Sequence, residues 1–115
     1  MAFVDGVVCA VPTANRETYR SHAEEMAAEF KKYGALSVVE CWGNEVPDGE
    51  VTSFPMAVKC KPDETVVFSW IMWPSQATRD EAWGKMMEES ELLAKPFPYD
   101  GGRMIYGGFD VMLEA

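Results

Sequence analysis

The sequence predicts an α+β domain in which four strands form an antiparallel sheet and two helices cover one of its faces. Two observations support this fold class. Runs of strand length that are rich in valine and aromatic residues alternate with two segments whose apolar residues recur at helical spacing. The strand-like runs are also apolar on both faces. The 115 residues are 48% hydrophobic and 25% charged, which fits a single domain over residues 1–115 with its own core.

The first strand is predicted at residues 3–11, which are rich in valine, and Pro12 ends it. A helix follows, with Asn15 as the N-cap residue and Gly34 at the position after its C-terminus. Two lysines near that end suit the helix dipole. The buried stripe of this helix is formed by Tyr19, Ala23, Met26, Ala27 and Phe30.

The middle of the chain contains one clear strand and one ambiguous segment. Residues 36–42 form the second strand, and residues 43–49 form a loop that turns at its Pro-Asp-Gly sequence. Residues 52–61 fit two structures equally well. Ser53 and Pro55 would start a short helix, whereas the alternation of apolar residues before the turn at residues 61–64 would suit a strand.

The last third of the chain is predicted to contain a strand, a helix and a strand. Residues 65–73 form the third strand, and the second helix starts at Ser75 or, by its capping box, at Thr78. The helix runs to residues 96–98, where a Pro-Phe-Pro sequence ends it. The last strand covers residues 103–113 and is interrupted by two glycines. The buried stripe of the helix is Ala82, Trp83, Met86, Met87 and Leu93.

This order, β-α-β-β-α-β, is typical of ferredoxin-like folds, in which both helices lie on one face of the sheet. The other face should then be polar where it meets water, yet both faces are apolar. In the first strand Phe3, Val7, Cys9 and Val11 share one face, and Val4, Val8 and Ala10 share the other. In the third strand Phe68, Trp70 and Met72 oppose Val67, Ile71 and Trp73. In the last strand Met104, Tyr106 and Met112 oppose Ile105, Phe109, Val111 and Leu113.

The second apolar face needs a cover, and we expect a homodimer in which a second sheet supplies it. An interface of roughly 1,600 Å² would be ordinary for such a pair. The alternative is that residues 43–61 fold over this face in a monomer. These residues are few and carry many charges, which favours the dimer.

Charge and cysteine content exclude several classes of function. The net charge of −9 disfavours nucleic acid and anionic membranes as partners. No apolar stretch is long enough to span a bilayer. Three scattered cysteines without a CxxC pair, and a single histidine, give no metal-ligand spacing. No dinucleotide-binding glycine pattern occurs. We therefore expect a cytoplasmic protein without a metal or cofactor.

Four stretches together resemble the YbaA-like family of bacterial proteins. They are Val46–Gly49, Val51–Pro55, Val66–Trp70 with Pro74-Ser75, and Asp100–Phe109, which includes RMIYGGF. The resemblance extends from Val4 to about Val111 and implies the fold of the dimeric α/β-barrel superfamily, in which two ferredoxin-like sheets pack face to face. The activity of the family is not established, so the resemblance implies no catalytic residues.

Three titratable residues are candidates for catalysis. Asp5 and Glu40 each interrupt an apolar strand, where burial would raise the pKa of a carboxyl group and suit it to proton transfer. Either one could instead pair with Arg103 or a backbone donor, or lie at a strand edge. His22, the only histidine, is either a boundary residue or a general base.

The aromatic content suggests an apolar pocket, with Trp70, Arg103 and Tyr106 as candidate ligand-binding residues, although core packing would explain the same aromatics. We expect a small-molecule-binding dimer. The alternatives are a cofactor-independent enzyme of the monooxygenase or isomerase type, and a structural or regulatory interaction protein.

Overall fold

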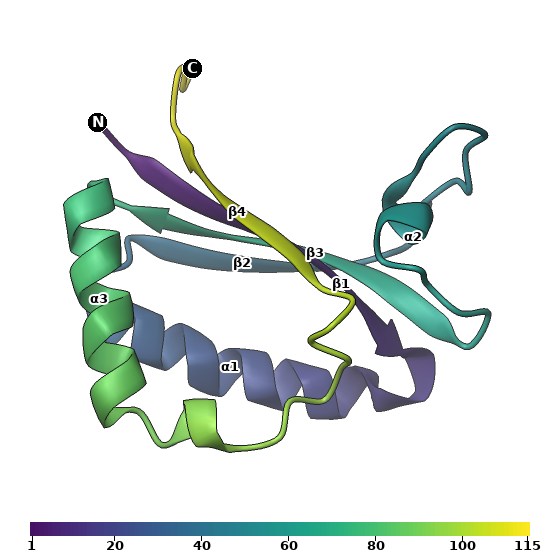
Figure 1. Cartoon of the computed structure of the whole chain (residues 1–115), viewed down its shortest axis with the longest axis horizontal. Helices are drawn as coiled ribbons and strands as arrows, with labels where there is room; N and C mark the ends of the chain where they lie inside the picture. The colour runs from purple at the N-terminus through teal and green to yellow at the C-terminus, as the bar shows by residue number, and fades with distance from the viewer.

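The computed structural model describes residues 1–115 and has the predicted order of strands and helices. The strands are β1 Phe3–Pro12, β2 Ser37–Trp42, β3 Glu64–Trp73 and β4 Ile105–Asp110, and the helices are α1 Arg16–Lys32, α2 Phe54–Ala57 and α3 Gln76–Glu89. All strand pairs are antiparallel, in the order β2-β3-β1-β4. Helices α1 and α3 lie on one side of the sheet, and α2 lies on the other side (Figure 1). The predicted ferredoxin-like α+β fold is confirmed.

Helix α1 has the predicted boundaries. Asn15 is the N-cap residue, although its side chain makes no capping hydrogen bond. At the other end the chain turns at Gly34, whose φ of +117° lies in the region that side chains with a Cβ rarely adopt. The amide of Ala35 then donates to the carbonyl of Phe30 at 3.0 Å, which closes the helix.

The ambiguous segment at residues 52–61 forms a helix and not a strand. Ser53 caps α2, because its Oγ accepts a hydrogen bond from the amide of Met56 at 3.1 Å. The residues after α2 turn as predicted, with the amide of Glu64 donating to the carbonyl of Lys61 at 3.0 Å. Val58, just after α2, is fully buried on the sheet face that α1 and α3 leave open.

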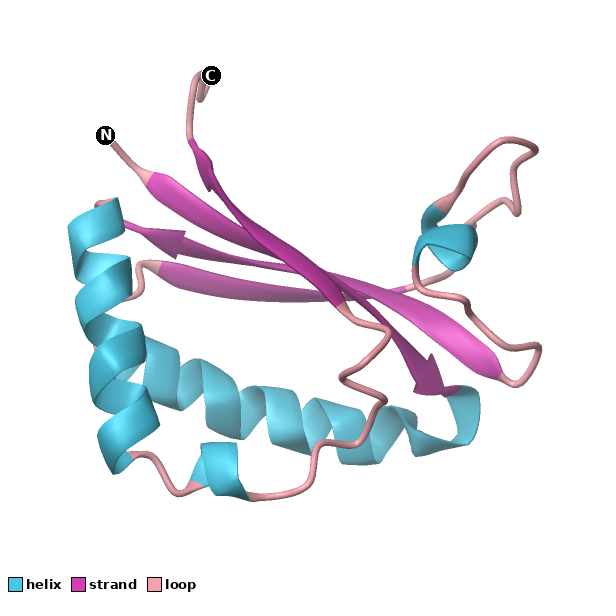
Figure 2. Ribbon diagram, in the orientation of Figure 1, coloured by secondary structure: helices cyan, strands magenta, loops and turns pink.

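Helix α3 starts at the first of its two predicted caps but ends early. The Oγ of Ser75 accepts a hydrogen bond from the amide of Thr78 at 3.1 Å. The prediction that the helix continues to the Pro-Phe-Pro sequence is wrong, because α3 ends at Glu89. Its last turn has no basic residue, and glutamates there oppose the helix dipole. A short 3₁₀ turn, Leu92–Ala94, follows (Figure 2).

Strand β4 is shorter than predicted and is not interrupted. Its register with β1 is continuous, with Gly107 opposite Gly6 and Gly108 opposite Asp5. The two glycines therefore do not mark a bulge. Gly108 marks a close approach instead, because the Phe3 ring and the Arg79 guanidinium occupy the space that a Cβ would fill.

The main core lies between the sheet and the two long helices. It is centred on Trp73, which has 0% of its surface exposed and meets the ring of Phe30 edge-on at 6.2 Å. A second cluster, around Cys9 and Tyr19, lies nearer the start of α1. Both clusters use the faces of β1 and β3 that alternation predicts, so the predicted division of these two strands into two faces is confirmed.

The opposite sheet face is apolar as well, and it is covered at one end only. Val58 packs there on Val8, Ala10 and Val66, so the segment predicted as the alternative cover does shield part of this face. Beyond α2 the face stays open. Ile105 and Phe109 on β4 are 45% and 58% exposed. We call the uncovered region the open face; its residues are Val4, Val39, Phe68, Trp70, Met72, Ile105 and Phe109.

The close approach at Gly108 predicts a large cost for adding one methyl group. In Gly108→Ala the new Cβ would lie 2.5 Å from the Phe3 ring, and we expect the free energy of unfolding to fall by about 1–3 kcal/mol. Gly84, inside α3, has no neighbour within 4 Å of its Cβ position. Gly84→Ala is the control and should stabilise the protein by about 0.5–1 kcal/mol. Urea unfolding measures both, and equal stabilities for the two variants would contradict this packing.

Candidate functional site

A groove of about 400 Å³ runs between α1 and the edge strand β2. Helix α1 and strand β2 run in opposite directions, so the start of α1 lies beside the end of β2 (Figure 1). Alternation along β2 directs every second side chain toward α1, which is why a polar residue and a tryptophan two positions apart both reach the groove. Its principal side chains are Arg16, Tyr19, Ala23, Val38, Glu40 and Trp42.

The polar centre of the groove is a hydrogen bond from the Tyr19 hydroxyl to Oε1 of Glu40, at 2.5 Å. The other carboxylate oxygen, Oε2, accepts no hydrogen bond from the chain, and Glu40 is an exposed residue of β2, so a ligand can reach it. Burial raises the pKa of Glu40, and the Tyr19 hydrogen bond opposes that rise. Burial and the neighbouring carboxylate raise the pKa of Tyr19 far above its ordinary value. Tyr19 is therefore a permanent donor to Glu40.

The inner wall behind Tyr19 is closed by Cys9 of β1 and by Tyr99 from the segment between α3 and β4. The Tyr19 and Tyr99 ring centroids are 5.9 Å apart. Burial raises the pKa of the Cys9 thiol to about 12 and that of the Tyr99 hydroxyl to about 12. Both groups stay protonated at neutral pH. Cys9 is therefore a packing residue and not a nucleophile.

His22 lies beside this wall and not in the groove. It is half-buried on α1, and its ring meets Phe97 at 5.3 Å and Tyr99 at 6.2 Å. Burial lowers the pKa of His22, and this effect outweighs the opposing charge of Glu25. A neutral imidazole within an aromatic cluster fits the boundary role better than the role of a general base.

Asp5 lies at the other end of the helix-facing side and does not contact the groove. It is buried, and its oxygens accept hydrogen bonds from the Trp73 indole at 2.9 Å and from the Arg79 guanidinium at 3.0–3.2 Å. The partner is thus Arg79 of α3 and not Arg103, which was the partner considered from the sequence. The Trp73 hydrogen bond joins β3 to β1, and the Arg79 hydrogen bonds join α3 to β1, so the Asp5–Arg79 pair fixes the helix on the sheet.

The three residues predicted to bind a ligand lie in three different places. Trp70 is on the open face, where its ring packs 5.6 Å from that of Phe68. Tyr106 is on the helix side of β4 and is 77% exposed. Arg103 lies in the turn before β4. The structure of the single chain does not bring them together, so their assignment to a ligand stays a prediction.

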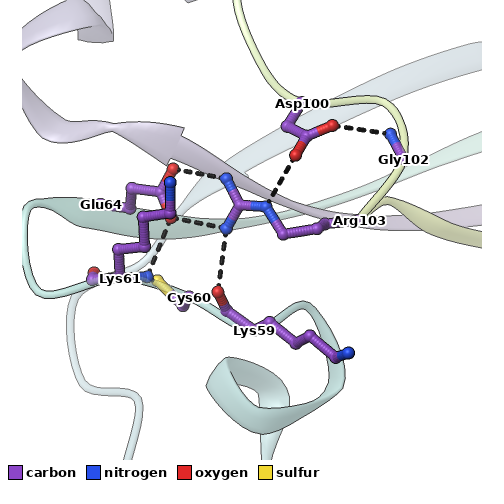
Figure 3. A network of polar contacts seen from close by, with 7 residues as sticks. All are labelled: Lys59, Cys60, Lys61, Glu64, Asp100, Gly102 and Arg103. Atoms are coloured by element: carbon purple, nitrogen blue, oxygen red, sulfur yellow. Dashed lines mark hydrogen bonds and ion pairs between the residues drawn. The ribbon is translucent and has the colours of Figure 1, made fainter.

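Arg103 is the centre of a polar network that joins three chain segments (Figure 3). Its guanidinium donates to both carboxylate oxygens of Glu64 at 2.7 Å, to Asp100 at 3.0 Å and to the carbonyl of Lys59 at 2.9 Å. The bidentate geometry matches an arginine fork to a carboxylate. The network holds the turn before β4 against the start of β3, which is a structural task.

Two residues that bond the candidate carboxylates Glu40 and Asp5 were not predicted in that role. Tyr19 was assigned to the buried stripe of the first helix, and Arg79 was not singled out. A signal for Tyr19 was present, since its hydroxyl needs a partner when the ring is buried and Glu40 interrupts an apolar strand on the helix-facing register. No group of three His, Cys, Asp or Glu side chains is close enough to hold a metal ion, and no helix has the length and hydropathy to cross a membrane.

Comparisons with known proteins place the chain in a family. Residues 2–101 match the family described as "Protein of unknown function (DUF1428)". The chain belongs to the DUF1428 family. It is 49% identical to "Uncharacterized protein YbaA" of Escherichia coli K12 and to the protein of the same name from Shigella flexneri, over 99% of both chains. The YbaA-like resemblance is thereby confirmed.

A solved structure shows the same fold as this DUF1428 protein. It is a Bacillus cereus protein described as a candidate antibiotic biosynthesis monooxygenase, with a TM-score of 0.53. The match covers 99% of this chain and 96% of that chain, at 17% sequence identity. At this identity the likeness supports the ferredoxin-like fold and not the activity.

The Arg103 network predicts how stability depends on pH. The Arg103 hydrogen bonds lower the pKa of Glu64 from 4.5 to about 2. A carboxyl whose pKa falls on folding stabilises the protein above its unfolded-state pKa and loses that contribution as the pH falls through the folded value. In Glu64→Gln we therefore expect a lower free energy of unfolding at pH 7 and a shallower decline between about pH 5 and pH 2.

Urea unfolding at several pH values measures this difference. Glu50→Gln is the control, since Glu50 is exposed and makes no ion pair or side-chain hydrogen bond, and this variant should follow the wild-type curve. Parallel pH curves for wild type and Glu64→Gln would show that the network does not contribute in this way.

Proposed function

We propose that this DUF1428 protein binds a small molecule in the groove between α1 and β2. The observation that supports it is a groove of about 400 Å³ with the Tyr19–Glu40 hydrogen bond at its centre. Binding sites of small molecules have volumes of about 300–1,000 Å³ and combine apolar walls with a few polar groups that fix the ligand. Ala23, Val38 and Trp42 supply the apolar walls here.

The protein is also proposed to act as a homodimer through the open face. Sheet residues there are large and apolar, and α2 shields only the end around Val58. A second copy would cover Phe68, Ile105 and Phe109 with the same residues of its own sheet, as a two-fold interface requires. The groove lies on the opposite side of the sheet, so this arrangement leaves it accessible. We also expect the protein to work in a reducing, cytosolic environment, because its three scattered cysteines are free.

A second candidate function is cofactor-independent proton transfer. The observation that favours it is the raised pKa of Glu40 beside the Tyr19 donor, since a carboxyl with a pKa nearer neutrality is a better general base or acid. The Bacillus cereus protein described as a candidate monooxygenase has the same fold, which is an analogy of fold only. Turnover of a bound compound that is lost in Glu40→Gln would favour this candidate over simple binding.

Thermal-shift measurements with small aromatic acids, quinols and flavins test the binding proposal. A ligand at a tenfold excess over its Kd should raise the Tm by about 5 °C. Ala27 lines the groove, whereas Ala28 beside it is exposed and does not. Ala27→Phe should therefore abolish the shift, and Ala28→Phe should keep it. A flat response to the whole panel, or equal loss in the two variants, would overturn the proposal.

Sedimentation at micromolar concentration tests the dimer. We expect twice the 12.9 kDa mass of the chain. Ile105→Asp places a charge on the open face and should give a monomer, because an unpaired charge in an interface is costly. Met87→Asp is the control, since Met87 is 76% exposed on α3, away from the sheet. A wild-type monomer would contradict the dimer, as would dissociation caused equally by both substitutions.

A further inference from the structure

Two pairs of side chains divide the groove into two polar positions. At the end nearest the start of α1, the Arg16 guanidinium lies over the Trp42 ring, 5.6 Å from its centroid. One step further along, the Tyr19 hydroxyl bonds Glu40 at 2.5 Å. The helix and the strand run in opposite directions (Figure 1). The earlier residue of α1 therefore meets the later residue of β2, and the later residue of α1 meets the earlier one.

The first position carries an unpaired cation. Arg16 makes no ion pair, whereas its neighbour on the same helix face, Arg20, is paired with Glu24 at 3.2 Å. Arg16 is also the first residue of α1, where the helix dipole favours a negative charge. Since the Trp42 ring holds the guanidinium by its face, the N–H groups at its edge stay free for a planar anion. Because the net charge of −9 disfavours anion binding in general, a local cation such as Arg16 is needed to bind an anionic group.

The second position offers an acceptor. Tyr19 occupies Oε1 of Glu40 as a donor, and Oε2 has no partner. A ligand hydroxyl that donates to Oε2 would complete the hydrogen bonding of this carboxylate, and a hydrogen bond to a charged acceptor is stronger than one to a neutral acceptor. A ligand carboxylate at the same point would be repelled. The two positions are thus complementary to an anionic group and to a neutral donor, respectively.

The separation of the positions sets the length of the ligand. Glu40 and Trp42 are two residues apart on a strand, which is about 7 Å. Arg16 and Tyr19 are three residues apart on a helix, a rise of about 4.5 Å. One benzene ring separates substituents at opposite positions by a similar length. Apolar side chains also line the groove beside the two positions, with Ala23 and Val67 among them, and they suit the faces of such a ring.

We propose that the groove binds a single-ring aromatic carboxylic acid with a hydroxyl group opposite the carboxylate, the carboxylate at Arg16 and the hydroxyl at Glu40. This inference rests on the proposed binding function and specifies its ligand class. Arg16 and Glu40 then act as the two residues that determine specificity, one by charge and one by hydrogen-bond direction. Trp42 and Tyr19 position them.

Isothermal titration with three matched probes tests the proposal. 4-Hydroxybenzoate has both groups, 4-hydroxybenzamide lacks the charge, and 4-methylbenzoate lacks the hydroxyl donor. We expect the Kd of 4-hydroxybenzoate to be lower than that of either analogue by a factor of about ten or more. Each analogue lacks one of the two hydrogen bonds that join the ligand to a charged side chain. Equal affinities for the three probes would overturn the assignment without use of any variant.

Two variants should then separate the contributions. Arg16→Gln should weaken both carboxylates by about tenfold and leave 4-hydroxybenzamide unchanged. Glu40→Gln should weaken both hydroxyl compounds and leave 4-methylbenzoate unchanged, since a neutral amide oxygen accepts less strongly than a carboxylate. Lys31→Gln, at the far end of α1, is the control for a loss of net positive charge and should match wild type. Equal losses for all probes, or the same loss in Lys31→Gln, would contradict the proposal.

The outcome also separates this inference from the function on which it rests. If 4-hydroxybenzoate does not bind but another aromatic compound stabilises wild type and not Ala27→Phe, the ligand class is wrong and the binding function stands. If no compound gives that pattern, both proposals are wrong.

Discussion

The central strands of this protein, β1 and β3, are apolar on both faces, and most of the architecture follows from that constraint. A two-layer fold must bury one face beneath its helices, and here α1 and α3 do so around Trp73. The other face then has to be covered by something else. The short helix α2 and Val58 cover one end of it, which leaves the open face as an apolar surface that the fold itself does not cover.

Asp5 and Glu40 both lie on the helix-facing side of the sheet, and their different partners give these two carboxylates different roles. Asp5 meets a guanidinium and an indole N–H, so its charge is compensated inside the structure. Glu40 meets only the phenol of Tyr19 and keeps one oxygen free at the edge of the sheet. A carboxylate that is fully paired serves to hold elements together, whereas one that is half-satisfied beside a groove can still take part in recognition. This contrast is why the candidate site is placed at β2.

Patterns that act over short distances predicted most of the fold. Alternation in β1 and β3, the helical stripe of α1 and the glycine after it all specify local structure, and the structure confirms them. The extent of α3 was harder to predict, because Leu93 packs against the core from a 3₁₀ turn and so continues the apolar pattern beyond the helix. The structure of residues 52–61 depended on Ser53 capping, which competed with an equally good alternating pattern.

The candidate site was less predictable because it depends on which strand edges come beside which helix. Glu40 was recognised as unusual from its strand alone, but its partner is 21 residues away on another element. Likewise, Asp5 pairs with a residue 74 positions away, and no local pattern distinguishes Arg79 from Arg103 as that partner. Trp70 and Tyr106 were grouped by chemistry, and the register of β1 with its two neighbours separates them onto opposite faces.

The four tryptophans occupy four different environments, and this gives the protein a set of built-in optical probes. Trp73 is sealed in the core, Trp83 lies against Phe30 between the helices, Trp70 lies on the open face and Trp42 lies beneath Arg16. Proteins that keep one tryptophan each, with phenylalanine at the other three positions, would report separately on core melting, helix packing, self-association and occupation of the groove through their emission wavelength.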